Sequence, residues 1–142
     1  MNTFFVLRRR YVRRDGAKFD VRSDLAVPLI DGVELTDMLD DRDEGVSFAL
    51  VSPPGGQWTG SPTYVEYGRP VILDGTCGIA GCCGVVARIT IDREVVRWHD
   101  FYAHGSPPLP SHLDFTFERS EYEAAIEGAS SLTPHDRFIR RD

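Results

Sequence analysis

The stretch that decides the fold is GVVARITIDREVVRWHDFY, residues 84–102, which holds the two strongest β-strand patterns of the chain. Each half is rich in β-branched and aromatic residues, and the polar run DRE between the halves can turn the chain. We therefore expect an antiparallel hairpin at the centre of a sheet. Side chains alternate between the two faces of a strand. The residues expected to share one face are Val96, Trp98, Asp100 and Tyr102, with Trp98 as an anchor of the core.

Further strands are expected on both sides of this hairpin. The N-terminal run TFFVLRRRYVRRDGAKFDVR has two β-rich segments around Asp15-Gly16, a pair that favours a tight hairpin turn. Residues 25–30 should form at most an edge strand, because Pro28 has no N–H to donate to a neighbouring strand. VSFALV, residues 46–51, and LDFTFER, residues 113–119, have the composition of further strands.

One helix is expected near the C-terminus. In SEYEAAIE, Ser120 and Glu123 have the spacing of a capping box, and Gly128 is placed to end the helix. Beyond it, Thr133 before Pro134 is typical of a helix start, so the tail should form one short turn. Together these elements predict an α+β fold: a mainly antiparallel twisted β-sheet with one C-terminal α-helix packed on one face.

The composition is that of one globular domain. With 142 residues, 42% of them hydrophobic, the chain can bury a core without metals or disulfides, so residues 1–142 are expected to form a single domain. The cysteines are odd in number and the apolar start MNTFFVL is too short for a signal peptide, which predicts a cytoplasmic protein with free thiols. No apolar run reaches the roughly 18 residues of a membrane-spanning helix, so no membrane partner is expected.

The net charge of −6 conceals two segments of opposite sign. Residues 8–22 are rich in arginine, whereas residues 31–44 are rich in aspartate and glutamate. We expect the arginines to form an exposed sheet face that pairs with neighbouring acids of the same molecule. Nucleic acid is not an expected partner, because an acidic chain would repel the polymer elsewhere on its surface. The acidic segment either balances those arginines or meets a partner protein with a basic surface.

All three cysteines, Cys77, Cys82 and Cys83, lie within seven residues among glycines. Zinc needs four ligands at tetrahedral positions, and one conceivable set is Cys77, Cys82, His99 and His104. In a regular strand the two histidines would point to opposite faces, so they converge only if the strand ends between them. The preferred interpretation is a structural turn in which small, partly buried cysteines pack under a glycine-rich bend.

A thiol nucleophile is a second alternative for this loop. Cys82 or Cys83 could pair with His99 across the central hairpin. However, Asp100 points away from its neighbour in a regular strand and cannot orient that histidine. An anion-binding nest is a third alternative, although no Lys, Ser or Thr stands where a phosphate-binding loop would have it. No catalytic residue and no cofactor are therefore predicted, with zinc as the alternative.

The C-terminal half of the chain, from DGTCGIAGCCGVVARITIDREVVRWHDF to SEYEAAI, resembles a group of small uncharacterised bacterial proteins that are frequent in actinobacteria. That group carries Cys-x-Cys-Gly-x-x-Gly-Cys before an apolar strand and then a Val-x-Trp strand. The matching positions are Cys77, Gly78, Gly81, Cys82, Val96 and Trp98. Gly75 stands where the group has its first cysteine, which weakens the case for a metal site. The resemblance implies no activity, but proteins of this size and type are often immunity or accessory partners of larger bacterial systems.

The expected function is that of a small cytoplasmic protein-binding module, with immunity toward a toxin as one member of the class. Trp58 lies in a loop by composition, and it either folds back over the core or forms a contact surface. Tyr64 and Tyr67, near loop ends, are further candidate anchors of an interface. The residues expected to bind the partner are Asp40, Asp41, Asp43 and Trp58. The competing class is an enzyme or metal-binding protein built around the cysteine loop and the two histidines.

Overall fold

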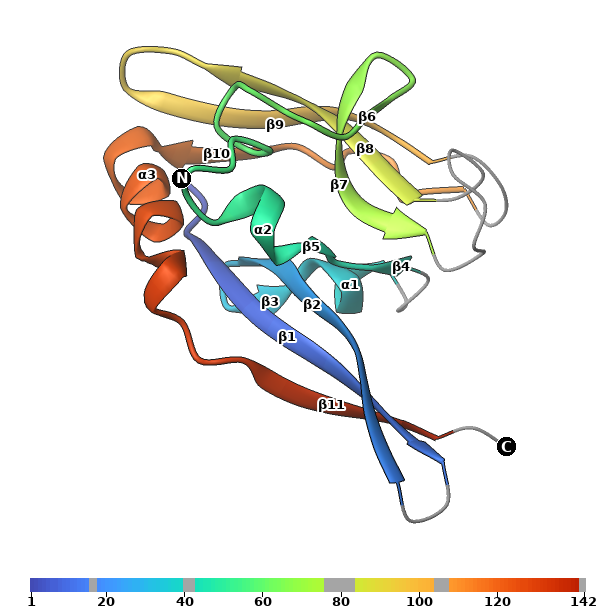
Figure 1. The fold of residues 1–142 in the computed structure, drawn as a ribbon. Helices are drawn as coiled ribbons and strands as arrows, with labels where there is room; N and C mark the ends of the chain where they lie inside the picture. Colours follow the sequence, from blue (N-terminus) through green and yellow to red (C-terminus); the bar gives the residue numbers. More distant parts are fainter. Residues whose placement is uncertain (16–17, 40–42, 76–83, 104–107, 141–142) are drawn as a thin grey trace.

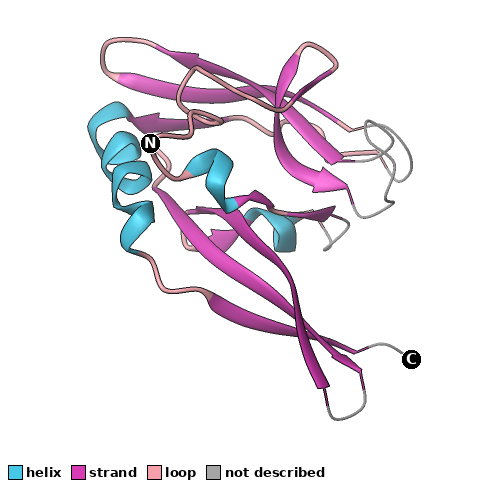
Figure 2. Ribbon diagram, in the orientation of Figure 1, coloured by secondary structure: helices cyan, strands magenta, loops and turns pink. Residues whose placement is uncertain are grey.

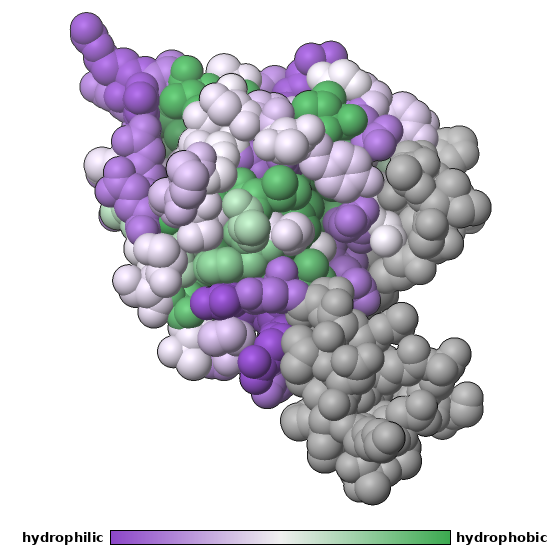
Figure 3. All heavy atoms as spheres, in the orientation of Figure 1, coloured by the Kyte–Doolittle hydropathy of each residue, from purple (hydrophilic) through white to green (hydrophobic). Residues whose placement is uncertain are grey.

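The computed structural model describes residues 1–15, 18–39, 43–75, 84–103 and 108–140, and it contains two β-sheets that lie one above the other (Figure 1). Strands make up most of both layers, whereas the helices lie between the layers and at one end of them (Figure 2). The apolar faces of the two sheets therefore meet in one core, and hydrophobic side chains are visible at the level between the layers in the space-filling view (Figure 3).

The first sheet is built on a long N-terminal hairpin. Its strands are β1 (Phe4–Asp15), β2 (Lys18–Ile30), β3 (Val33–Glu34), β5 (Val46–Ser47) and β11 (His135–Arg140). The order is β11-β1-β2-β3, and β5 also pairs with β2. The hairpin of β1 and β2 confirms the prediction made from Asp15-Gly16, although residues 16–17 lie outside the described residues. β11 pairs with β1 in parallel, so the helical turn expected after Thr133 is wrong.

The second sheet is built on the predicted central hairpin. Its strands are β4 (Asp43–Glu44), β6 (Val65–Glu66), β7 (Arg69–Gly75), β8 (Gly84–Ile91), β9 (Val95–Tyr102) and β10 (Phe115–Glu118). The order is β10-β9-β8-β7-β4, β6 pairs with β7, and each of these pairings is antiparallel. The hairpin of β8 and β9 and the strand expected in LDFTFER are thereby confirmed.

The α+β class is confirmed, and the expected single antiparallel sheet is confirmed only in part. The strands are divided between two sheets, and the pairing of β11 with β1 is parallel. β2 is not an edge strand, since it pairs with β1 on one side and with β3 and β5 on the other. Pro28 is tolerated because it lies between the residues of β2 that pair with β5, Leu25 and Ala26, and those that pair with β3.

The helices are α1 (Leu35–Met38), α2 (Phe48–Val51) and α3 (Arg119–Glu127), and a 3₁₀ turn, η1 (Gly128–Ser131), follows α3. The predicted capping box of Ser120 and Glu123 is wrong, because Glu118 takes the N-cap position of α3. The Ser120 hydroxyl instead donates a hydrogen bond to the Glu118 carboxylate at 2.6 Å. The strand expected over residues 46–51 is confirmed only for Val46–Ser47; from Phe48 onward the prediction is wrong, because residues 48–51 form α2. In the described part of the chain, no helix combines the length and hydropathy needed to cross a membrane.

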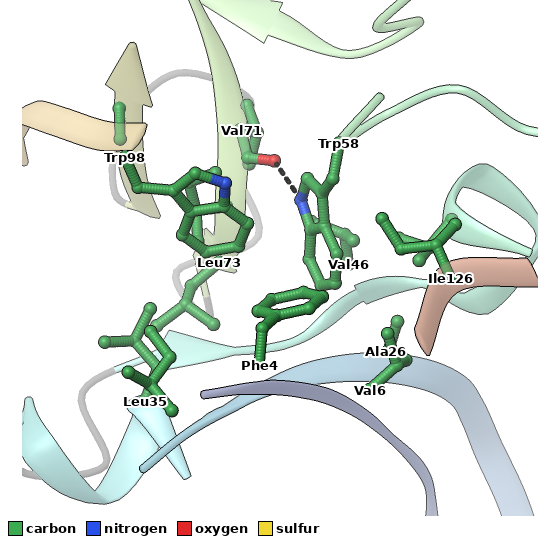
Figure 4. Packing of buried hydrophobic residues seen from close by; sticks show 14 of the residues in the cluster. Phe4, Val6, Ala26, Leu35, Val46, Trp58, Val71, Leu73, Trp98 and Ile126 are labelled. Atoms are coloured by element: carbon green, nitrogen blue, oxygen red, sulfur yellow. Dashed lines mark hydrogen bonds between the residues drawn. The ribbon is translucent and has the colours of Figure 1, made fainter. Parts of the chain in front are cut away.

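An aromatic cluster fills the space between the sheets. The ring of Phe4 lies 4.5 Å from that of Tyr122, 5.3 Å from that of Trp98 and 6.1 Å from that of Trp58, measured between centroids. Figure 4 shows Phe4 between the two indoles, and it shows the Trp58 indole N–H directed at the carbonyl of Val71. Trp98 has 0% of its surface exposed, which confirms it as a core residue.

The loop that carries Trp58 is held by a buried glutamine. The Gln57 side-chain amide donates to the carbonyls of Tyr64, at 2.6 Å, and Val71, at 3.2 Å. Its oxygen accepts hydrogen bonds from the backbone N–H groups of Thr63 and Tyr64. Trp58 is 0% exposed as a result, so it folds back over the core and does not form the contact surface considered as the alternative.

Candidate functional site

The candidate site begins with an irregularity in the central hairpin. The register of β8 and β9 shifts between Val86 and Arg88, so that Asp100 and Phe101 of β9 lie opposite a single residue of β8. Asp100 has a positive φ of 53°, a conformation that aspartate adopts more readily than most residues. Such a bulge re-aims the side chains that follow it, and bulges are common next to functional sites.

After the bulge, the residues of β9 expected to face the core point outward, and those expected to point outward face the core. Val96 and Trp98 point into the core, as expected, but Asp100 and Tyr102 are exposed, while Phe101 packs against the core instead. The prediction that Asp100 and Tyr102 share the face of Trp98 is therefore wrong. Strict alternation cannot anticipate the extra residue that the bulge inserts.

Asp100 is held between two arginines on the outer side of this sheet. Its Oδ2 atom accepts a hydrogen bond from Arg69 Nη2 at 2.8 Å and another from Arg88 Nε at 2.7 Å. Arg69 and Arg88 hold the pKa of the Asp100 carboxyl below its ordinary value through these hydrogen bonds and through their charge. Arg69 also donates to the carbonyl of Tyr67 at 3.3 Å. One carboxylate thus organises two cations on the surface.

Two exposed tyrosines complete this arrangement. The rings of Tyr67 and Tyr102 meet edge to face with centroids 4.9 Å apart, and the two residues are 47% and 38% exposed. The Arg69 guanidinium lies 5.9 Å from the centroid of Tyr102. We call this surface the tyrosine–arginine patch; its members are Tyr67, Arg69, Arg88, Asp100 and Tyr102.

A strained turn places Tyr67 in the patch. Tyr67 and Gly68 connect β6 to β7 with φ values of 54° and 69°, as a two-residue hairpin turn of this kind requires. A positive φ is unfavourable for a bulky residue such as tyrosine. Only four non-glycine residues in the described part of the chain have a positive φ, and Tyr67 and Asp100 are two of them. Strain of this kind persists where the surrounding structure enforces it, and it is often found at functional sites.

A surface hollow of about 470 Å³ adjoins the patch. It is lined by Asp100 and Tyr102, with their neighbours Phe101 and Ala103, and by the proline-rich segment 108–113. His112 of that segment has a positive φ of 74°. Aromatic, apolar and charged groups therefore line one recess at the C-terminal end of β9.

Most residues of the proposed zinc site and of the proposed thiol nucleophile lie outside the described residues. These are Cys77, Cys82, Cys83 and His104. His99 is described: its Nε2 atom lies 2.8 Å from the Thr90 hydroxyl on the outer side of the sheet. Among the described residues, no group of three His, Cys, Asp or Glu side chains is arranged to hold a metal ion. The zinc site stays a prediction.

The acidic partner-binding residues are also largely undescribed. Asp40 and Asp41 lie outside the described residues, and of Asp43 only the backbone, in β4, is described. Two other acids of that segment serve the fold. Asp31 accepts hydrogen bonds from the side chain of Asn2 and the backbone of Thr3, and Glu34 forms an ion pair with Arg9 at 2.6 Å.

The arginine stripe pairs within the molecule, as expected, at the positions whose side chains are described. Arg8 forms an ion pair with Asp24, and Arg10 forms one with Asp136, each at 2.7 Å. These pairs connect β1 to both of its neighbours, so the arginines of β1 serve the first sheet.

The sequence interpretation named Tyr67 but missed the other members of the patch. One signal was present: aspartate is depleted in strands, so Asp100 in the middle of a strand pattern is a candidate for a bulge. Comparisons with protein-family models, curated proteins and solved structures find no match to this chain. The assignment of a function therefore depends on the geometry of the site.

Proposed function

We propose that the protein is a binding module that contacts another protein through the tyrosine–arginine patch. The observation that carries the proposal is the exposed ring pair of Tyr67 and Tyr102, with the Arg69 guanidinium 5.9 Å from the centroid of Tyr102 and Arg88 joined to Arg69 through Asp100. Tyrosine and arginine are among the residues that contribute most binding energy at protein interfaces. Two tyrosines, two arginines and a hollow at one place form a surface of the kind that anchors a partner.

The organisation of the patch supports the same function. Asp100 fixes both guanidinium groups, and the edge-to-face contact restrains both rings before any partner arrives. Binding then costs less side-chain entropy than it would on a flexible surface, because fewer rotamers are lost. The strained backbone at Tyr67 and Asp100 is consistent with a surface maintained for contact.

The size of the chain and the sequence of its C-terminal half indicate the class of protein. A cytoplasmic immunity protein or an accessory partner of a larger bacterial system fits the size of the chain and the resemblance of its C-terminal half. The prediction that the partner has a basic surface is based on the acidic segment, residues 31–44. Within that segment, Asp31 and Glu34 interact with residues of the same chain. For Asp40, Asp41 and Asp43 a basic partner stays a prediction, and the patch is the surface on which the present proposal depends.

The test compares capture by matched surface variants. The tagged protein is cross-linked in an actinobacterial cell extract, and captured proteins are quantified by mass spectrometry. The test variant is Tyr67→Ser with Tyr102→Ser; the control is Phe5→Ser, which removes an aromatic residue that is 58% exposed on β1. We expect a protein that the wild type and the control capture and that the double variant loses. Equal capture by the wild type and the double variant would overturn the proposal.

A further inference from the structure

We propose that the tyrosine–arginine patch binds an acidic segment of its partner, with Arg88 as the residue that takes a carboxylate. The inference rests on the proposed function and adds the chemistry of the partner. It starts from the charge balance of the patch, in which two guanidinium groups share one oxygen of one carboxylate. Counted over its five members, the patch carries a net charge of +1, and a second carboxylate on the partner would complement it.

Arg88 is the cation that remains available. Its side chain is 54% exposed, and it uses only Nε to bond Asp100. Within the described part of the chain, its two terminal nitrogens make no hydrogen bond. A guanidinium whose edge is free can donate two parallel hydrogen bonds to a carboxylate, a stronger contact than a single neutral hydrogen bond. The hydrogen bond from Arg88 Nε to Asp100 restricts the guanidinium, which prepares Arg88 for the contact.

Arg69 has a different part in the arrangement. Its side chain is only 18% exposed, and its Nε atom is buried without a hydrogen-bond partner in the described part of the chain. It bonds Asp100 and the Tyr67 carbonyl and lies near the ring of Tyr102. Arg69 is therefore a positioning residue that joins the acid to both tyrosines, whereas Arg88 faces the partner.

The remaining surface indicates what should accompany the carboxylate. The rings of Tyr67 and Tyr102 present apolar area in the same patch, since Asp100 joins Arg88 to Arg69 and the Arg69 guanidinium lies 5.9 Å from the centroid of Tyr102. An aromatic or aliphatic side chain next to the partner's acid would pack on these rings. The net charge of −6 disfavours an acidic partner at long range. That repulsion is screened over about 8 Å at physiological ionic strength, whereas a bidentate contact acts at hydrogen-bond distance.

The test uses a display library of random dodecapeptides selected on the immobilised wild-type protein. We expect enrichment of peptides with aspartate or glutamate next to an aromatic or aliphatic residue. Selection on Arg88→Glu should lose this acidic preference. The matched control is Arg97→Glu: Arg97 is 50% exposed on the same sheet and forms an ion pair with Asp114 at 2.5 Å. This control should keep the acidic preference, and thermal unfolding of each variant checks that it is folded.

Affinities of one selected peptide give the second readout. Arg88→Gln should weaken binding about tenfold or more, because a charge-assisted contact is lost, while Arg97→Gln should stay within about twofold of the wild type. Suppose that the enriched peptides are basic or uncharged and do not bind the Tyr67→Ser, Tyr102→Ser double variant. This result would overturn the inference of an acidic partner segment but would leave the proposed function standing. No enrichment, or binding that survives the double variant, would contradict the patch itself.

Discussion

Trp98 and Tyr102 lie four residues apart on β9, yet they belong to surfaces of opposite character. Trp98 is buried in the aromatic cluster between the sheets, whereas Tyr102 is 38% exposed, with the Arg69 guanidinium near its ring. The bulge at Asp100 separates them, because it turns the side chains that follow to the other face. The same strand therefore supplies the core with one anchor and the outer surface with another.

The two clusters are also held in different ways. In the core, the Tyr122 hydroxyl donates to the carbonyl of Trp58 and accepts from the Trp98 indole N–H at 3.1 Å. Burial raises the pKa of Tyr122 above its ordinary value, so the hydroxyl stays protonated and keeps donating. The patch is held by the ion pairs of Asp100 with Arg69 and Arg88, and Asp100 is 48% exposed to solvent, which weakens the contribution of such pairs to stability. We therefore expect core variants to affect folding and patch variants to affect binding.

The largest expected effect is that of Trp98→Ala, which removes a fully buried indole. A cavity of this size should lower the free energy of unfolding by about 3–5 kcal/mol. The measurement is urea unfolding followed by circular dichroism. An unchanged midpoint would show that Trp98 does not anchor the core and would remove the basis of the comparison with Tyr102.

Tyr122→Phe should have a smaller effect, because it keeps the ring and removes only the hydroxyl. The Trp58 carbonyl and the Trp98 indole N–H would then lose the partner that joins them. Leaving a buried polar group unsatisfied costs about 1–3 kcal/mol. Urea unfolding should show a loss in that range, and the aromatic near-ultraviolet signal should persist. A loss as large as that of Trp98→Ala would mean that the hydroxyl organises the whole cluster.

Asp100→Asn tests the centre of the patch, because asparagine also adopts a positive φ but has no charge. The lowered pKa of Asp100 means that its ion pairs stabilise the fold above about pH 4 and that this stabilisation is lost as the pH falls through the folded-state pKa. The melting temperature of the wild type should therefore exceed that of the variant slightly at pH 7, and the gap should close in acid. A gap that is independent of pH would show that the charge of Asp100 is not what stabilises this site.

The smallest expected effect on stability is that of Tyr102→Ser. An exposed side chain away from the core should change the free energy of unfolding by no more than about 0.5 kcal/mol. The same variant should lose binding of the peptide selected on the wild type, as a titration would measure. A variant that binds normally but melts early would reverse the comparison, and Tyr102 would then belong to the fold.

Local patterns were sufficient to predict several elements. The hairpin of β8 and β9, the N-terminal hairpin and the burial of Trp98 follow from β-branched runs, a turn pair and a large apolar side chain. Each depends on residues close together in the chain. The existence of α3 was also predicted, although its start was misplaced because Glu118, and not Ser120, takes the N-cap position.

The sequence by itself thus determined the central hairpin, the class of fold and the main anchor of the core. Only the tertiary structure decided three further features. Residues 135–140 form a strand because β1 offers an unpaired edge more than a hundred positions away. Residues 48–51 turn into a helix after β5 ends, since that turn buries Phe48 and Val51 together. Finally, the bulge at Asp100 builds the patch: the arginines that hold it come from β7 and β8, and no pattern within β9 reports contacts between strands.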